Sequence, residues 1–182
     1  MSMQMIANES CLLIVDVQER LIPVMRAPRQ VIAGCATLMR AGGLIGLPIL
    51  VSEQYVQGLG PTMVDLRPLA PPDSFMEKTA FGCAADAGIM ARIESLSRHQ
   101  VVMAGIESHV CVLQSALSLR EKGFEVFVVA DACSSRQPES EQAAWARMAL
   151  CSVHVVTLEM ALFEWLGSKD HPAFKEVQRL IK

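Results

Sequence analysis

The chain has 182 residues, of which 52% are apolar and 19% are charged, and its formal net charge at pH 7 is −3. This composition excludes a disordered chain, and the small negative charge argues against non-specific binding of nucleic acid. Uncharged stretches such as residues 41–52 contain Gly and Pro and are shorter than the roughly 18 apolar residues that a bilayer span needs. The first ten residues carry no Lys or Arg, unlike a signal peptide, so we expect a cytoplasmic protein without a membrane partner.

Apolar runs alternate with segments of helical periodicity along the chain. The runs predict strands at residues 11–17, 47–52, 100–105, 125–130 and 153–157, and the periodic segments predict helices at 27–41, 84–98, 108–122, 138–150, 159–166 and 172–181. Strands that are apolar on both faces and separated by helices are typical of a parallel sheet covered on each side. The sequence therefore predicts a three-layer α/β/α fold. Since no repeat or linker is visible, we expect a single domain over residues 1–182.

In such folds, ligands bind at the carboxyl ends of the strands, so the residues that follow each strand are the first candidates for a site. Asp16 and Gln18 stand at the end of the first strand, residues 53–55 follow the second, and residues 107–111 follow the third. A carboxylate is costly to bury without a partner. The pattern indicates that the first strand continues through Val17, so a helix cap explains Asp16 poorly and a role in a site is favoured. Residues 53–73 form a long loop in this prediction, and loops of that length are often functional.

The six cysteines show no C-x-x-C spacing, which favours reduced and mostly buried thiols over a disulfide framework. Cys111 is predicted at a helix N-terminus, where unpaired N–H groups and the helix dipole favour a thiolate. From the residues alone, an ordinary packed thiol is an equally good interpretation. For Lys78, the alternative to a functional role is a surface side chain paired with Glu77.

Three segments, taken in chain order, favour the functional interpretation of Asp16, Lys78 and Cys111. They are VDVQ at residues 15–18, EKTAF at 77–81 and GIESHVCV at 105–112. Together with Gly123 and residues 126–135 they resemble the isochorismatase-like cysteine hydrolases, and residues 53–60 resemble the small isochorismatase-domain-containing proteins. The resemblance covers nearly the whole chain. It implies a Rossmann-like, six-stranded parallel sheet with helices on both faces.

The resemblance also implies a catalytic set of Asp16, Lys78 and Cys111. Asp16 would be the general base, Lys78 the cation that favours the thiolate, and Cys111 the nucleophile that forms a covalent thioester. A cis peptide bond is implied between Ile106 and Glu107, and the backbone N–H groups of Glu107 and Cys111 would form an oxyanion hole. The implied activity is hydrolysis of a small amide, ester or related substrate, with a C–N amidase favoured.

No metal or other cofactor is expected. Relatives that bind a metal carry an Asp and two His residues near the second strand, whereas residues 52–55 read SEQY. The four histidines lack ligand spacing such as H-E-x-x-H. Relatives that cleave isochorismate often have a small residue at the position of Cys111. The presence of a thiol here therefore argues against isochorismate as the substrate.

Four residues flank the implied catalytic positions and are predicted to line a pocket for a small molecule: Gln18, Tyr55, Phe81 and His109. The resemblance further implies a homo-oligomer, either a dimer, a tetramer or a larger assembly. Two alternatives remain. One is an oligomeric binding or scaffold protein of the same fold whose catalytic set has decayed, and the other is a flavodoxin-like protein that binds flavin.

Overall fold

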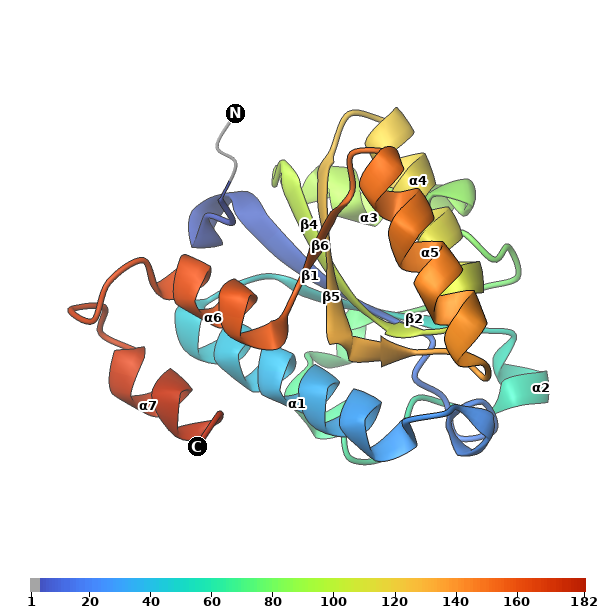
Figure 1. Cartoon of the computed structure of the whole chain (residues 1–182), viewed down its shortest axis with the longest axis horizontal. Coiled ribbons are helices and arrows are strands. Elements are labelled where there is room, and N and C mark those ends of the chain that lie inside the picture. The colour runs from blue at the N-terminus through green and yellow to red at the C-terminus, as the bar shows by residue number, and fades with distance from the viewer. Residues whose placement is uncertain (1–3) are drawn as a thin grey trace.

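The computed structural model describes residues 4–182, and residues 1–3, where the expected domain begins, lie outside the described part. A parallel sheet with the strand order β3-β2-β1-β4-β5-β6 forms the centre of the molecule (Figure 1). Its strands are β1 (Ser10–Val15), β2 (Ile49–Gln54), β3 (Phe75–Lys78), β4 (Gln100–Ile106), β5 (Glu125–Ser134) and β6 (His154–Val156). The predicted three-layer α/β class with six parallel strands is confirmed.

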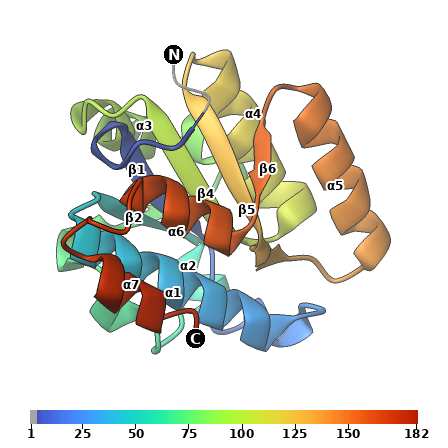
Figure 2. The same cartoon turned by 60° about the vertical axis from the view of Figure 1, so that its left-hand side comes forward.

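Helices cover both faces of the sheet, as Figure 2 shows most clearly. One face carries α1 (Pro28–Ile45), α6 (Leu158–Leu166) and α7 (Phe174–Arg179), and the other carries α3 (Ala87–Ser95), α4 (Leu113–Glu121) and α5 (Pro138–Leu150). Short turns complete the chain: α2 (Val56–Leu59), the 3₁₀ turns η1 (Ala7–Glu9), η2 (Ile22–Val24), η3 (Arg67–Leu69), η4 (Pro72–Ser74) and η5 (Cys83–Ala85), and the π-helical turn η6 (Ser108–Val112).

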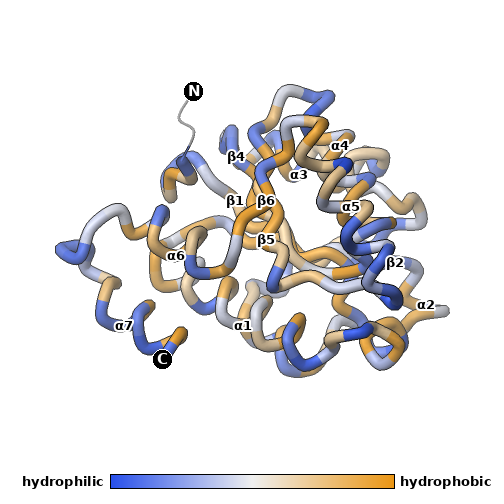
Figure 3. The backbone as a smooth tube through the Cα atoms, viewed as in Figure 1, coloured by the Kyte–Doolittle hydropathy of each residue, from blue (hydrophilic) through white to orange (hydrophobic). Residues whose placement is uncertain are grey.

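Burial of the strands follows from this layering. Every residue of β1 and of β4 is buried, because these central strands are covered on both faces. Hydrophobic segments accordingly concentrate in the sheet, and hydrophilic segments in the outer turns (Figure 3). No helix within residues 4–182 is long and apolar enough to cross a membrane.

Several predicted boundaries were wrong. β1 ends at Val15 rather than Val17, because Asp16 adopts a left-handed conformation with φ 52° and turns the chain out of the sheet. β5 continues to Ser134 rather than Ala130. The pattern also missed β3, and the loop predicted at 53–73 contains the end of β2 and three short turns.

The strand order reverses direction between β1 and β4, and ligands of such sheets usually bind at the carboxyl ends of the strands at this point. Gly105 makes the close approach of these strands possible. It has φ 124°, and a Cβ atom at this position would lie 2.2 Å from the carbonyl oxygen of Val15. The carboxyl ends of β1 and β4 are therefore side by side, with Asp16 following one and Glu107 following the other.

Candidate active site

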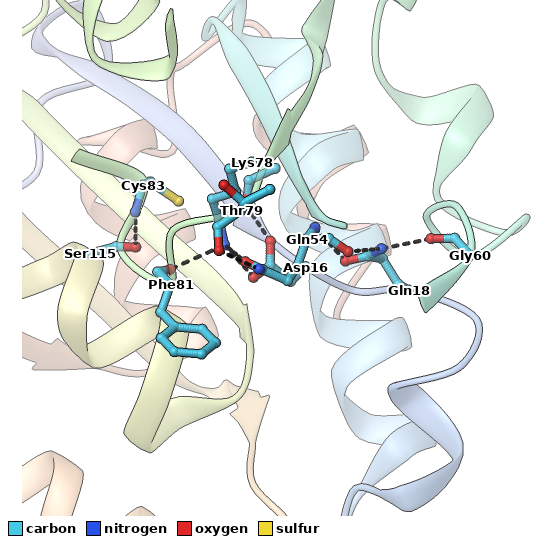
Figure 4. Close-up of polar contacts among 10 residues, drawn as sticks. Asp16, Gln18, Gln54, Gly60, Lys78, Thr79, Phe81, Cys83 and Ser115 are labelled. Carbon is cyan, nitrogen blue, oxygen red and sulfur yellow. Dashed lines mark hydrogen bonds and ion pairs between the residues drawn. The ribbon is translucent and has the colours of Figure 1, made fainter. Parts of the chain in front are cut away.

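A buried ion pair joins the carboxyl ends of β1 and β3 (Figure 4). Lys78 Nζ donates hydrogen bonds to Asp16 Oδ2 at 2.7 Å, Gln54 Oε1 at 2.7 Å and the carbonyl oxygen of Phe81 at 3.1 Å. An ammonium has three donors, so all of them are used. The alternative interpretation of Lys78 as a surface residue paired with Glu77 is wrong, because both side chains of the Asp16–Lys78 pair are fully buried.

Asp16 is held on both oxygens. Ser52 Oγ donates to Oδ1 at 2.7 Å while Lys78 occupies Oδ2, and the Asp16 N–H donates to the carbonyl oxygen of Ser52 at 3.1 Å. Burying a carboxylate is tolerated only when its charge and lone pairs are compensated in this way. Ser52 is itself buried at the end of β2, so the carboxylate has one fixed orientation.

Cys111 lies in η6, the turn that leads from β4 into α4, and it is 7% exposed. Burial raises the pKa of its thiol well above the ordinary value, and the neighbouring Asp16 raises it further through its charge and a hydrogen bond. Lys78 lowers this pKa, but by less than burial and Asp16 raise it. Burial and Asp16 therefore favour the protonated thiol, whereas Lys78 and the helix N-terminus favour the thiolate.

An irregular stretch of backbone leads from β4 to Cys111. The peptide bond between Ile106 and Glu107 is cis. The N–H groups of Val110 and Val112 both donate to the carbonyl oxygen of Glu107, at 3.1 and 3.2 Å. The Cys111 N–H lies between these two donors in the chain, inside the π-helical turn.

The structure assigns Gln18 a different place from the expected pocket wall. Its side chain is fully buried, and its amide bonds the main chain of Gln54 and Gly60. All of its polar groups are used inside the protein, so the expectation that Gln18 lines a substrate pocket is corrected. It supports the end of β2 instead.

Three other predicted pocket residues lie nearer the surface. Tyr55 and Phe81 are 51% and 56% exposed, and the ring of Phe81 points away from Lys78 (Figure 4). His109 is half-buried, and its Nδ1 lies 2.8 Å from Ser135 Oγ. The structure therefore brings Asp16, Lys78 and Cys111 together and leaves these aromatic side chains at the rim.

The sequence interpretation gave no site role to Ser52, Gln54 or Cys83. The strand-end rule includes Gln54 among its candidates, but its partner Lys78 lies on a strand that the pattern missed. Cys83 is fully buried beside Lys78, and its N–H donates to Ser115 Oγ at 2.8 Å (Figure 4). Burial raises the pKa of the Cys83 thiol, and Asp16 adds to this effect. Nothing in the sequence pattern indicates this second thiol near the site.

The side chains described for this site do not form a metal centre. Within residues 4–182, no group of three or more His, Cys, Asp or Glu side chains is arranged to hold a metal ion. The polar groups of the site are instead paired with one another. Its chemistry is that of a thiol next to a fixed carboxylate.

Comparison with known proteins agrees with this architecture. The isochorismatase domain model matches residues 10–160. Isochorismatase domain-containing protein 1 of Salmo salar is 38% identical over 167 residues, which are 92% of this chain but 59% of that protein. The chain belongs to the isochorismatase family and has the hydrolase fold of that family.

Solved structures give the same result. The MAR1 ribonuclease of Caenorhabditis elegans is 32% identical, with a TM-score of 0.92 over 98% of this chain and 92% of that one. The YcaC protein of Escherichia coli, described as an octameric hydrolase of unknown specificity, is 21% identical, with a TM-score of 0.88 over 99% of this chain and 95% of that one. This second likeness shows the fold alone.

Proposed function

We propose that the protein is a cysteine hydrolase that cleaves a small amide or ester through a covalent thioester on Cys111. The observation that carries this proposal is a buried carboxylate, held by Ser52 and Lys78 at the carboxyl ends of the strands, with the buried Cys111 thiol close enough for Asp16 to raise its pKa. A carboxylate in this position can accept the proton of the thiol during attack. A C–N amidase is the favoured type.

The proposed reaction uses these side chains in the following order. Asp16 takes the proton from Cys111 Sγ while sulfur bonds to the carbonyl carbon, and the oxygen gains charge facing the N–H groups of Cys111 and Glu107. The tetrahedral species then expels the amine or alcohol, which receives the proton from Asp16. Water attacks the thioester with Asp16 again as base, which releases the acid and restores the thiol. No step uses a metal.

Lys78 acts through Asp16 in this scheme. Its three N–H groups already bond protein acceptors, so it has no free donor for a substrate. Its positive charge compensates the carboxylate before proton transfer. We therefore describe Asp16 and Cys111 as the reacting groups and Lys78 as the residue that holds and balances Asp16.

The test is turnover of a panel of small amides and esters, with intact-mass detection of an acyl adduct. We expect Cys111→Ala to lose both turnover and adduct, and Asp16→Asn to lower turnover by at least about a thousandfold, the scale seen when members of a catalytic set are removed. Cys151→Ser is the matched control, because Cys151 is an exposed thiol outside the site. Unchanged turnover in Cys111→Ala would contradict the proposal.

RNA cleavage is a second activity to test, since the C. elegans relative is described as a ribonuclease. This chain offers little for phosphate recognition: its net charge is −3, and the Lys78 ammonium is saturated by protein acceptors. We expect single-stranded RNA to remain intact under conditions in which the small-molecule panel is turned over. Cleavage that is lost in Cys111→Ala would replace the amide or ester proposal.

We also propose that the protein is a homo-oligomer. The support is that the YcaC protein of Escherichia coli, which shares this fold, is described as octameric, and that Leu150, Val64 and Phe163 are exposed apolar side chains here. Light scattering during size-exclusion chromatography tests this proposal, and a monomer at all concentrations contradicts it. An inactive scaffold of the same fold is not favoured. It would show neither turnover nor a dependence of Cys111 labelling on Asp16.

A further inference from the structure

The side-chain amide of Gln18 bonds the main chain of Gln54 on both sides. Gln18 Oε1 accepts from the N–H of Gln54 at 2.7 Å, and Gln18 Nε2 donates to the carbonyl oxygen of Gln54 at 2.9 Å. The second Nε2 hydrogen goes to the carbonyl oxygen of Gly60 at 2.6 Å. One donor and two acceptors around the amide fix its orientation, because a flipped amide would lose these bonds. Gln18 therefore acts as a clamp on the last residue of β2.

That last residue connects the clamp to the ion pair. Gln54 Oε1 accepts from Lys78 Nζ at 2.7 Å, and Gln54 Nε2 donates to the carbonyl oxygen of Thr79 at 2.8 Å. Its side chain can hold Lys78 in place only if its backbone is fixed. Figure 4 shows the resulting row of Gln18, Gln54, Lys78 and Asp16. The main-chain N–H of Gln18 donates to the carbonyl oxygen of Asp16 at 2.8 Å, but the side-chain amide bonds only Gln54 and Gly60. The effect of the Gln18 side chain on Lys78 therefore passes through Gln54.

The loop after β2 does not depend on Gln18 alone. Arg20 Nη1 donates to the carbonyl oxygen of Gly58 at 2.8 Å, and Glu53 Oε1 accepts from both the N–H and the Oγ1 of Thr62 at 2.7 Å. The Gln18 bonds to Gln54 are therefore additional to those that keep the loop folded. The Gln18 amide is fully buried, and two of its bonds hold Gln54, the residue that accepts from Lys78. This arrangement indicates a more specific role than closing a loop.

We propose that Gln18 is a positioning residue for the hydrolase site, which holds Lys78 against Asp16 by clamping the backbone of Gln54. The inference rests on the proposed function, since it concerns the ion pair beside Cys111. It assigns Gln18 no contact with the substrate.

The rate at which iodoacetamide alkylates Cys111, followed by peptide mass between pH 6 and pH 9, tests this role without a known substrate. The carbon–sulfur bond forms, iodide leaves, and the thiol proton passes through Asp16 to water. We expect Gln18→Met to slow labelling by about tenfold to a hundredfold, the scale for misplacement of a supporting group by about 1 Å. The labelling profile also moves to higher pH, because Lys78 is the group that lowers the pKa of Cys111.

The controls separate positioning from stability. Arg20→Met removes a bond to the same loop and leaves Gln54 untouched, so it keeps the wild-type rate, and exposed Cys151 serves as the internal reference for the reagent. In a Lys78→Met background, Gln18→Met changes labelling by less than about twofold, because its route of action is already absent. If Gln18→Met does not fold, Gln54→Met removes the same support with the clamp intact and gives the same slowing.

Two results contradict different claims. A wild-type rate in Gln18→Met, or an equal loss with and without Lys78, overturns the positioning role and leaves the hydrolase proposal standing. If Cys111 is labelled at the same rate in Asp16→Asn as in wild type, Asp16 is not the base of the proposed function. The inference about Gln18 is then contradicted as well.

Discussion

Both ends of the sheet bury a polar network, and the two networks differ in what their atoms can do. At the amino end, Gln100 Oε1 accepts from the Ile6 N–H at 2.7 Å and Ser10 Oγ at 3.0 Å. Gln100 Nε2 donates to the Gln4 carbonyl oxygen at 2.9 Å and to Glu125 Oε2 at 3.0 Å. This amide joins the start of the chain to three strands and has no remaining hydrogen-bonding capacity.

At the carboxyl end, amides again provide support, but they surround a carboxylate, an ammonium and a thiol. Asp16 and Lys78 neutralise each other, and the Cys111 thiol borders the carboxylate. Burial and complete hydrogen bonding are therefore common to both ends and do not indicate catalysis by themselves. What distinguishes the carboxyl end is a thiol close to a carboxylate, at the strand ends where the connections diverge.

The largest effect is expected for Lys78→Met, which breaks the buried pair. Asp16 keeps Ser52 but loses its counter-charge inside the protein, and removing one partner of a buried pair costs about 3–5 kcal/mol. Urea unfolding of Lys78→Met measures this loss, with Cys111→Ser as a control that leaves the ion pair intact. A loss below about 1 kcal/mol would mean that the pair contributes as little as an exposed one.

A smaller effect is expected at the other network. Gln100→Leu leaves the Ile6 N–H, Ser10 Oγ and Glu125 short of partners, and an unsatisfied buried group costs about 1–3 kcal/mol. Iodoacetamide labelling of Cys111 in the folded variant stays at the wild-type rate, because this network lies at the opposite end of β4. Slower labelling would show that the two ends are coupled, and the comparison above would fail.

Alkaline pH tests a feature that both ends share, the buried thiol. Burial raises the pKa of Cys11 and of Cys133 to about 12 from 9.0. Their contribution to the free energy of unfolding is therefore complete below pH 9 and is lost as pH rises from 9 toward 12, at up to about 1.4 kcal/mol per pH unit for each thiol. Urea unfolding of wild type and Cys133→Ala at pH 8 to 10.5 measures the slope. Cys133→Ala is less stable at pH 8 and shows a flatter decline, and parallel curves would contradict this.

The sequence predicts the central strands well, because β1 and β4 are buried on both faces and read as continuous apolar runs. It predicts β3 poorly. That strand has four residues at the edge of the sheet and ends in Lys78, so neither its length nor its composition is typical of a strand. Lys78, which completes the ion pair, therefore lies in a segment that periodicity does not predict as a strand. Only the family resemblance indicated its role.

The supporting residues could not be predicted for a different reason. Gln18 and Gln54 are 36 positions apart, and their bonds depend on the register between β1 and β2 and on the turn at Asp16. A glutamine after a strand is an ordinary residue in the sequence. Its role appears only when the neighbouring strand is placed, because the clamp is a property of the pair.

The smallest effect is expected at a pair with one exposed member, in which exposed Arg26 Nη2 lies 2.8 Å from Oε2 of buried Glu141. Burial raises the pKa of Glu141, but bonds from Arg26, the Ser135 N–H and Ser134 Oγ outweigh it, so this pKa is lowered and its stabilisation is lost as pH falls. The Arg26 side chain is 51% exposed, so Arg26→Met costs only about 0.2–1 kcal/mol and less at high salt. Urea unfolding at low and high salt measures this. A loss as large as in Lys78→Met would mean that burial does not separate the two pairs.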